Sequence, residues 1–415
     1  MPLNVRIGFF LATRALRRAS LWTTGLIIGV MVLTFLNLVV VSGILVGLLE
    51  GAVVAVRTQY TSDVIISSLN DKKYIENSPN LLSLIGTLPE VRAYTARYRQ
   101  AGVVEANYKT RKDTDKPNTA NAMMVGINPA KEDSVTGIGG SIVEGSFLTP
   151  DDYDKVVIGG YLLKQYFPVE TPGFTTLENV GVGTKIRMSV GSVTREVTVK
   201  GILKSKVDEV SMRAYMVDSQ FRSLIGRNDG NVAEIALKVA PGADPRAVRD
   251  TLLARGAGIN AKVQTYEDAQ PKFLKDMITT FGMLGTAFSS IGLVVASITI
   301  FIVVFINAIT RRKFIGILKG IGIHGRAIEV SYVFQSVFYA LVGSLLGLIL
   351  VYAFLVPFFY AHPIDFPFSD GILVAPLGTT LLRVGLLVVT TVVAGFIPAM
   401  MIIRKNTLDS ILGRN

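Results

Sequence analysis

Long uncharged stretches interrupt this chain, and their length predicts helices that cross a membrane. Three of them contain no Asp, Glu, Lys or Arg, and a fourth contains only Arg383: residues 21–49, 277–310, 330–361 and 371–403. About 20 apolar residues suffice for a helix to cross a bilayer. The first run also far exceeds the roughly 7–15 apolar residues of a signal peptide. We therefore expect four uncleaved transmembrane helices.

The segment between the first and second runs has a different pattern, in which short alternating stretches are separated by turn residues. GTKIRMSV and TREVTVKGIL alternate around Gly191 and Ser192, which predicts a β-hairpin. AEIALKVA and then DPRAVRDTLLARG predict a strand, a helix that starts at Asp-Pro, and a stop at Gly256. SDVIISS, NAMMVGIN and AKVQTY predict further strands, KVVIGGYLLKQYF a strand followed by a helix, and residues 107–120 a loop. The pattern predicts an α+β domain, with residues 125–205 and the flanks as two lobes.

The second uncharged run is longer than a membrane span requires. As a helix, its 34 residues would extend about 50 Å, against a hydrocarbon core of about 30 Å. The first run is followed by LLEGAVVAVRTQY, which can continue its helix outward. We expect the two helices to project from the membrane together as a stalk that carries the α+β domain.

The basic residues flank the uncharged runs, and they predict the orientation of the chain. Residues 50–276 hold 29 of the 42 Lys and Arg and 27 of the 31 Asp and Glu, which leaves 13 basic and 4 acidic residues elsewhere. The net charge of +11 is therefore mostly a property of the membrane flanks, and it does not indicate nucleic-acid binding. Basic residues precede the first run and follow the second and fourth, whereas the loop after the third holds Asp365 and Asp370. The positive-inside rule then places both termini in the cytoplasm and residues 50–276 outside.

These observations divide the chain as follows: a basic cytoplasmic N-terminus at 1–20, a first transmembrane helix at 21–49, an extracytoplasmic domain at 50–276, a second helix with its stalk extension at 277–310, a cytoplasmic segment at 311–328, a third helix at 329–361, a short outer loop at 362–371, a fourth helix at 372–403 and a cytoplasmic tail at 404–415.

Motifs of enzymatic sites are absent from the sequence. There is no Cys, so disulfides, thiolate metal sites and cysteine nucleophiles are excluded. No Gly-Lys dipeptide occurs, which excludes a P-loop ATP site. His324 and His362 fall on opposite sides of the membrane and cannot share a metal. Asp151, Asp152 and Asp154 form an acidic cluster, for which a solvated turn is a better explanation than a cation site. We expect no catalysis, cofactor or metal in this chain.

Ionisable groups are also nearly absent from the predicted spans, which argues against an ion pathway through them. Arg383 is the exception, and we expect it to snorkel to the surface, with contact to a partner helix as the alternative. Two Gly-x-x-x-Gly pairs, Gly25 with Gly29 and Gly343 with Gly347, offer faces on which helices can pack closely.

The cytoplasmic segment RRKFIGILKGIGIHGRAIE holds five basic residues within sixteen positions. Arg311 to Lys313 can contact anionic headgroups. The apolar residues Ile315 to Leu318 are too few to cross a membrane, so they suit burial in the groove of a partner protein. Gly320 and Gly322 allow the chain to turn sharply there.

The order of these features resembles the FtsX-like and MacB-like ABC transporter permeases, which include the LolC/LolE lipoprotein-release subunits. Their segment between spans two and three commonly reads R-x-x-E-I-G-I-L-K/R-A-I-G-A. Residues 311–323 match at most positions, with Phe314 where the family usually has Glu. Pro398-Ala399 and the basic tail with Leu408 also match, although Thr407 replaces a Pro. MMVGINPAKEDSV, GSFLTPDDYDKVVIGGYLLKQY and VGTKIRM are similar to motifs of the family's outer domain.

The resemblance implies a MacB/LolCE-type (type VII ABC) permease fold and the permease half of an ABC transporter. Two permease chains, identical or paralogous, would pair over a dimer of cytoplasmic ATPase subunits that bind ATP and Mg²⁺. The segment between spans two and three would be the coupling helix, with contacts from Arg312, Phe314, Ile315, Gly316, Ile317, Leu318, Lys319, Gly320, Ile321 and Gly322. The permease would lie in the cell membrane and pass the motion of the ATPase to its outer domain. There it would extrude or release a lipoprotein, peptide, lipid or antibiotic-like cargo, or contact an accessory protein.

Two alternatives remain at this point. An FtsX-type regulator would use the same motion to activate a cell-wall hydrolase without transport, although its outer domain is usually smaller. A membrane-anchored receptor or scaffold would need no ATPase. Co-purification of an ATPase distinguishes the receptor from the other two, and stimulation of ATP hydrolysis by cargo distinguishes transport from regulation.

Overall fold

The chain folds into two compact units in a computed structural model that describes residues 3–112, 116–168, 175–366, 369–371 and 373–403. The first, here called the membrane unit, comprises Met1–Leu49, Asp276–Asp365 and Asp370–Asn415. The second, here called the outer unit, comprises Glu50–Lys275 and Phe366–Ser369. The predicted tail at 404–415 lies outside the described residues.

Among the residues that the structure describes, four helices are long and apolar enough to span a membrane, as the sequence predicted. The first runs without a break through α2 (Leu21–Leu36), a π-helical segment (Asn37–Val41), α3 (Ser42–Val56) and a second π-helical segment (Arg57–Thr61). The others are α9 (Lys272–Thr310), α11 (Gly325–Leu350) continued by a π-helical segment (Val351–Leu355) and α12 (Val356–Ala361), and α13 (Leu377–Ile403). The first three contain 41, 39 and 37 residues, about 55 to 60 Å each, so they exceed the length of one bilayer span.

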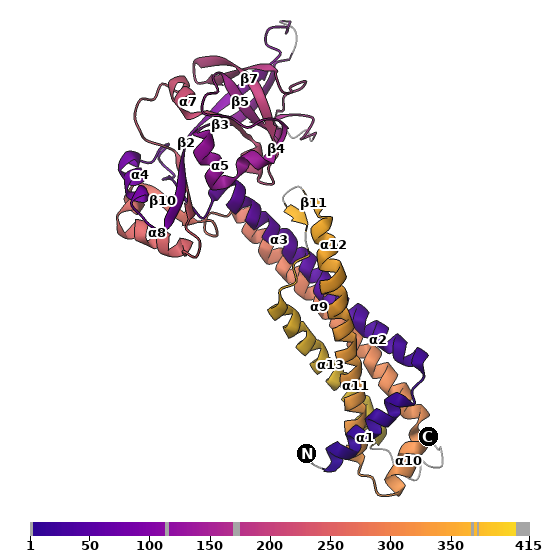
Figure 1. Ribbon diagram of the computed structural model, residues 1–415. Coiled ribbons are helices and arrows are strands. Elements are labelled where there is room, and N and C mark those ends of the chain that lie inside the picture. The colour runs from indigo at the N-terminus through magenta and orange to yellow at the C-terminus, as the bar shows by residue number, and fades with distance from the viewer. Residues whose placement is uncertain (1–2, 113–115, 169–174, 367–368, 372, 404–415) are drawn as a thin grey trace. The chain divides into compact units, whose positions relative to one another are not determined.

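Close packing within the membrane unit depends on glycines. A Cβ added at Gly343 would lie 2.3 Å from the Cβ of Met31, and one at Gly347 would lie 2.3 Å from Cδ1 of Phe35. These two glycines therefore let α11 lie against α2 (Figure 1). Gly292 of α9 accommodates Oδ1 of Asn37 in the same way, at 2.5 Å from its ideal Cβ.

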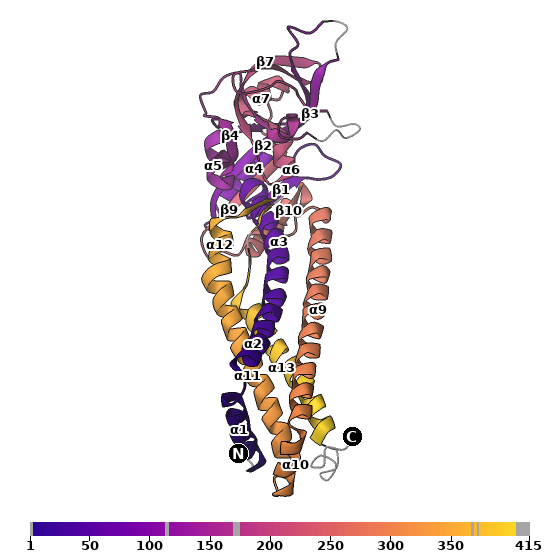
Figure 2. The same ribbon diagram turned by 90° about the vertical axis from the view of Figure 1, so that its right-hand side faces the viewer.

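Two smaller elements were not predicted. Residues 1–20 contain an amphipathic helix, α1 (Leu3–Arg17), which lies beside the first turns of α11 (Figure 2). The loop between the third and fourth spans contains two short strands, β11 (Ile364–Phe366) and β12 (Ser369–Gly371), which pair with each other. The two strands, of three residues each, are too short for a periodic pattern to be visible in the sequence.

In its described residues, the outer unit is built on ten strands in one sheet. They are β1 (Val64–Ser68), β2 (Val91–Ala106), β3 (Asn118–Ile127), β4 (Ile142–Gly145), β5 (Lys155–Gly159), β6 (Lys185–Val190), β7 (Val193–Leu203), β8 (Arg213–Val217), β9 (Glu234–Val239) and β10 (Ala261–Thr265), in the order β10-β1-β9-β2-β3-β8-β5-β7-β4. Strand β6 also pairs with both β2 and β7, which closes β2, β3, β8, β5, β7 and β6 into a ring. The long β2 pairs with β9 in its first half and with β6 in its second, so it belongs to both the ring and the flanking sheet.

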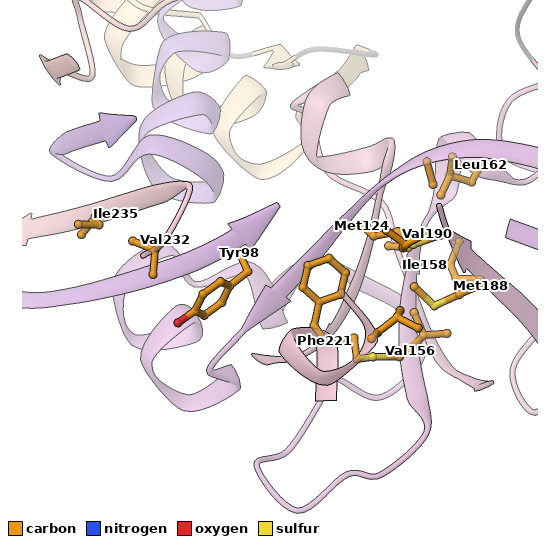
Figure 3. Packing of buried hydrophobic residues seen from close by; sticks show 14 of the residues in the cluster. Tyr98, Met124, Val156, Ile158, Leu162, Met188, Val190, Phe221, Val232 and Ile235 are labelled. Atoms are coloured by element: carbon orange, nitrogen blue, oxygen red, sulfur yellow. The ribbon is translucent and has the colours of Figure 1, made fainter. Parts of the chain in front are cut away.

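The helices of the outer unit cover this sheet and are mostly short. They are α4 (Ser78–Gly86), α5 (Pro129–Thr136), α6 (Asp208–Ser211), α7 (Asp218–Leu224) and α8 (Pro245–Ala254), with 3-10 turns at Ile138–Ser141, Gly160–Leu162 and Ala257–Ile259. Phe221 of α7, Met124 of β3 and Ile158 of β5 are fully buried in one continuous core (Figure 3).

Most predicted elements of the outer unit are present. The β6–β7 hairpin turns at Gly191, whose φ of 58° lies in the left-handed region that favours glycine. The side chain of Asp244 caps α8 by accepting from the backbone N of Arg246. Strands β1, β3, β9 and β10 fall in the stretches that predict them, and β3 begins at Asn118, within the range predicted as a loop.

The prediction of a helix after β5 is wrong. The chain makes only a 3-10 turn at Gly160–Leu162, after which Leu163 adopts an extended conformation. The backbone N of Leu177 donates to the carbonyl of Leu162, and the N of Lys164 donates to the carbonyl of Leu177. This bridge to a later segment takes the hydrogen bonds that a helix would need, and it buries Leu162 and Leu163 in the core.

Candidate functional site: a coupling segment and a buried joint

The cytoplasmic segment singled out in the sequence forms its own short helix, α10 (Arg312–Gly320). Gly322, with a φ of 94°, ends the turn after it, which explains the need for glycine at this position. The ring Nδ1 of His324 then accepts from the backbone N of Arg326 and caps the start of α11. The segment is thus a helix held between two sharp turns.

The two faces of α10 differ in what they contact. Ile315 and Gly316 are buried, and Ile315 and Leu318 belong to the apolar core of the membrane unit. Lys319 donates from Nζ to the carbonyl of Ile403 at the end of α13. These residues fix the helix to its own unit.

The opposite face of α10 is apolar and exposed. Phe314 is 58% exposed, Ile317 52% and Ile321 71%, and their spacing of three and four residues places them on one side of the helix. We call Phe314, Ile317 and Ile321 the outward face of α10. Of the residues expected to contact an ATPase, Ile315 and Gly316 are covered by the chain itself, whereas the outward face is open to a partner.

The predicted glycine pairs differ in their surroundings. Gly343 and Gly347 lie against α2, as described above. Within the described part of the chain, no atom lies within 4 Å of a Cβ added at Gly25 or Gly29. The packing role of Gly25 and Gly29 therefore stays a prediction.

Arg383 contacts another helix of the membrane unit. Its Nη2 donates to the Oγ of Ser42 on α3 at 2.5 Å, within the membrane unit. A polar partner on a neighbouring helix satisfies part of the hydrogen-bonding capacity of the guanidinium. The alternative reading, contact with another helix, is the one observed.

A second cluster of charged residues, which the sequence did not reveal, lies inside the outer unit. Arg97 of β2, Arg213 of β8, Glu132 of α5 and Glu234 of β9 are each only 1% exposed. Arg97 pairs with Glu132 at 2.6 Å and with Glu234 at 3.4 Å, and Arg213 pairs with Glu234 at 3.3 Å. We call this set the buried ion cluster. Because four strands or helices each contribute one residue, no local spacing in the sequence predicts it.

The buried ion cluster holds the end of the first long helix. Tyr60, in the π-helical segment Arg57–Thr61, donates from its hydroxyl to Glu209 at 3.1 Å and to Glu234 at 3.3 Å. Its carbonyl accepts from Nη2 of Arg97 at 2.8 Å, and the guanidinium of Arg213 lies 4.6 Å from the centre of its ring. Cation–π contact and hydrogen bonds therefore fix Tyr60 on three sides.

Further contacts connect the entry and exit of the outer unit. Arg57 pairs with Asp63, just before β1, at 2.6 Å, and its guanidinium lies 4.5 Å from the ring of Tyr266, just after β10. The Oε1 of Gln59 accepts from the Oγ of Ser205 at 2.5 Å. We call Arg57, Gln59 and Tyr60 with these partners the joint.

The charges of the buried ion cluster set the ionisation of Glu234. Burial alone raises the pKa of a carboxyl, but the charges of Arg213, Arg97 and Arg99 outweigh it and lower the pKa of Glu234 to about 2. Arg99 lies closest, at 2.6 Å. Glu234 therefore stays ionised at neutral pH.

Two members of the acidic cluster at Asp151, Asp152 and Asp154, namely Asp152 and Asp154, pair with basic residues. Asp152 pairs with Lys155 at 2.9 Å and with Lys200 at 2.5 Å, and Asp154 pairs with Arg195 at 2.5 Å. Burial raises the pKa of the Asp152 carboxyl, but hydrogen bonds from the two lysines and from the backbone of Thr149 outweigh this effect and lower the pKa. Among the described residues, no group of three His, Cys, Asp or Glu is placed to hold a metal ion.

A surface groove of about 670 Å³ lies on the outer unit, near the joint. Ala101 and Val103 of β2 and Met123 of β3 contribute apolar surface, and Met212 and Glu209 contribute from the region of α6. Since Glu209 also accepts from Tyr60, the groove borders on the residues that hold the helix end.

These features define the class of protein: a polytopic membrane protein with a large α+β domain between its first two apolar helices and a short amphipathic helix after the second. The comparisons with known proteins name the family. The MacB-like periplasmic core domain matches residues 20–255, and the FtsX-like permease C-terminal domain matches residues 286–407. The chain belongs to the FtsX-like and MacB-like family of ABC transporter permeases.

Two solved structures to which the chain is similar are a periplasmic region and an extracellular domain. The periplasmic region of MacB from Actinobacillus actinomycetemcomitans is 18% identical, with a TM-score of 0.36, over 51% of this chain and 92% of that one. The extracellular domain of the noncanonic ABC-type transporter YknZ from Gram-positive bacteria is 13% identical, with a TM-score of 0.33, over 49% of this chain and 100% of that one. A search of curated proteins found no match.

Proposed function

We propose that this chain is the permease subunit that couples ATP hydrolysis on a separate cytoplasmic ATPase to work done by its extracytoplasmic domain. ATP and Mg²⁺ would bind to the partner, since the sequence has no P-loop. The permease would act with a second copy or a paralogue over two ATPase subunits, in the cell membrane, with residues 50–276 outside. Its cargo class is a lipoprotein, peptide, lipid or antibiotic-like molecule.

The outward face of α10 is the observation that carries this proposal. An exposed apolar surface at the polar end of a helical bundle is costly unless a partner covers it. Three apolar side chains on one face of a short helix are typical of a helix that docks into a groove. The buried face of α10, fixed through Ile315 and Leu318, gives such a contact a rigid base.

The joint supports the transmission of motion into the outer unit. Tyr60 and Gln59 lie in the last turn of a helix that begins at Leu21, and α9 returns to the membrane unit as a single helix. A displacement of the first helix along its axis acts directly on β2, β8 and β9 through Tyr60 and its charged partners. We propose that the joint converts this displacement into a rearrangement of the outer unit.

A pull-down of the tagged full-length chain, extracted in detergent from its native cells, tests the proposal. The wild-type chain should co-purify with an ABC ATPase and show ATP hydrolysis. Ile317→Asp or Phe314→Asp places a charge in the outward face, which we expect to cost about 2 kcal/mol or more at a docked hot spot. Binding of the ATPase should then weaken about thirty-fold.

The matched control is Lys313→Gln, which alters an exposed neighbour outside the outward face. It should leave association and ATP hydrolysis close to the wild-type level. The membrane unit should unfold at the same temperature in all three variants, since none of these side chains is buried. Retention of the ATPase by Ile317→Asp and Phe314→Asp at wild-type level would refute the assignment of α10.

A further inference from the structure

Helix α1 presents a face that nothing in the described part of the chain covers. Leu3 is 72% exposed and Phe10 60%, and Arg6, Arg14 and Arg17 are exposed as well. At 100° per residue these five side chains fall within one narrow stripe of the helix. We call this stripe the outward face of α1.

The opposite side of α1 fixes it at the end of a membrane span. A Cβ at Gly8 would lie 2.8 Å from the carbonyl of Ala327 and 2.7 Å from Cγ1 of Val330, so α1 touches the start of α11 directly. The ring of Phe9 meets that of Phe334 edge-on at 5.4 Å. These contacts fall within the first ten residues of α11, about 15 Å along its axis.

Helix α1 is not an extension of the first span. Ser20 has an extended conformation, with φ of −60° and ψ of 129°, and it breaks the helix before α2. Immediately after the break, Leu21 is 91% exposed and Trp22, the one Trp of the chain, is 82% exposed. Tryptophan at the end of a membrane helix is typical of the headgroup region.

The charge on α1 has one sign. Residues 1–20 contain Arg6, Arg14, Arg17 and Arg18 and no Asp or Glu. Within the described residues, none of these arginines forms an ion pair with a carboxylate. A helix that mixes exposed aromatic and basic side chains, next to a span, suits the boundary between anionic headgroups and acyl chains.

We propose that α1 is an interfacial helix whose outward face binds the anionic phospholipid headgroups of the leaflet at which α10 lies. Phe10 and Leu3 insert among the upper acyl carbons, and Arg6, Arg14 and Arg17 contact the phosphates. The contacts at Gly8 and Phe9 connect the state of the leaflet to the first turns of α11, directly after α10. This surface is distinct from the outward face of α10 and does not depend on an ATPase.

The chain is well suited to a direct test because it has one Trp and no Cys. Full-length protein is reconstituted into nanodiscs of phosphatidylcholine alone or mixed with phosphatidylglycerol, with brominated lipid or aqueous acrylamide as quenchers. The variant Trp22→Phe with Phe10→Trp carries its single Trp on α1. Brominated lipid should quench this Trp, and acrylamide should quench it several-fold less than in the control.

The control is Trp22→Phe with Tyr153→Trp, because Tyr153 is 68% exposed on the outer unit. Its Trp should respond to acrylamide and be insensitive to brominated lipid. Unaltered Trp22 of the wild-type chain gives a second reading without any substitution on α1, and brominated lipid should quench it as well.

Adding Arg6→Gln, Arg14→Gln and Arg17→Gln to the Phe10→Trp chain tests the headgroup contact. Protection from acrylamide should be stronger in anionic than in neutral nanodiscs, and this difference should disappear in the triple variant. A basic residue near an anionic surface changes the docking equilibrium by about five-fold. Equal protection in both lipids, unchanged by the substitutions, would overturn the anionic contact.

Two further results would overturn the proposal as a whole. If the Trp at position 10 is as open to acrylamide as the Trp at position 153, the outward face of α1 lies in water. If it is protected from acrylamide but insensitive to brominated lipid, a protein covers it, either a second copy of the chain or the ATPase.

Discussion

At the scale of single residues, Glu234 has the most specific environment in the outer unit. It is 1% exposed and accepts from three arginines that belong to β2 and β8. A buried ion pair adds little net stability compared with apolar packing, but removing one partner leaves the others buried and uncompensated. We therefore expect that neutralising one member of the buried ion cluster strongly lowers the stability of the outer unit.

We expect Glu234→Gln to lower the free energy of unfolding of the outer unit by about 3–5 kcal/mol. The measurement is denaturant unfolding of the full-length chain in detergent, followed by a label on the outer unit. Glu178→Gln is the matched control, because Glu178 is 55% exposed and pairs with Lys164 on the surface. Its cost should stay below about 1 kcal/mol. Equal costs for the two variants would mean that the cluster is hydrated.

The same residue predicts a dependence on pH. Its pKa is lowered from 4.5 to about 2, so ionised Glu234 contributes stability that is fully present above about pH 4.5. This contribution is lost as the pH falls toward 2. The difference in unfolding free energy between the wild type and Glu234→Gln should thus shrink over this range. A difference that stays constant down to pH 2 would contradict the assigned pKa.

At the scale of elements, the contact of α11 with α2 depends on the absence of two side chains. We expect Gly347→Ala to force its methyl group into the ring of Phe35, 2.3 Å from the ideal Cβ. Overpacking of this kind costs about 1–3 kcal/mol, so the temperature at which the detergent-solubilised chain unfolds should fall. Gly385→Ala in α13 is the control, since no described atom lies within 4 Å of its ideal Cβ. If the unfolding temperature falls equally in both variants, the detergent, and not the contact with Phe35, causes the decrease.

The sequence predicts the elements of this chain unevenly, for physical reasons. The four spans follow from length and composition alone, because a bilayer imposes one requirement on every residue of a span. The β6–β7 hairpin and α8 follow from local turn and cap chemistry. Residues 160–167 are wrongly predicted as a helix, because their pairing partner, Leu177, is too distant in the sequence for a local pattern to reveal it.

The candidate site divides in the same way. The position of α10 could be predicted from its charge and its location between two spans. Which side of α10 faces outward could not, because it depends on how Ile315 and Lys319 contact other helices. The joint could not be predicted from the sequence. Its residues come together only through the pairing of β2, β8 and β9 with their neighbours in the sheet: Tyr60, Arg97, Arg213 and Glu234.

At the scale of the whole molecule, the joint is expected to separate ATP hydrolysis from its effect outside. Tyr60→Ala removes the ring between Arg97 and Arg213 and the hydroxyl that donates to Glu209. In the complex with the ATPase, hydrolysis should continue, whereas the ATP-dependent change in hydrogen exchange of β1 and β9 should disappear. The measurement is hydrogen–deuterium exchange with and without ATP.

Tyr153→Ala is the control for this experiment, because it removes an exposed tyrosine from the same unit. It should keep both hydrolysis and the exchange response. An unchanged response in Tyr60→Ala would show that motion reaches the outer unit by another route, whereas a loss of hydrolysis would indicate that the variant disrupts assembly with the ATPase.

The pairing of β1 constrains how this protein is made. β1 leaves the membrane unit first, yet its two neighbours are β9 and β10, and Val64 is opposite Leu237 and Thr265. Contacts between residues so far apart in the chain form slowly, because a long loop must close first. During synthesis, β1 emerges with both edges unpaired, because its neighbours β9 and β10 begin only at Glu234 and Ala261. A free strand edge of this kind is a site for mispairing. The outer unit is therefore prone to mispairing during synthesis until β10 has been synthesised and pairs with β1, just before α9 begins.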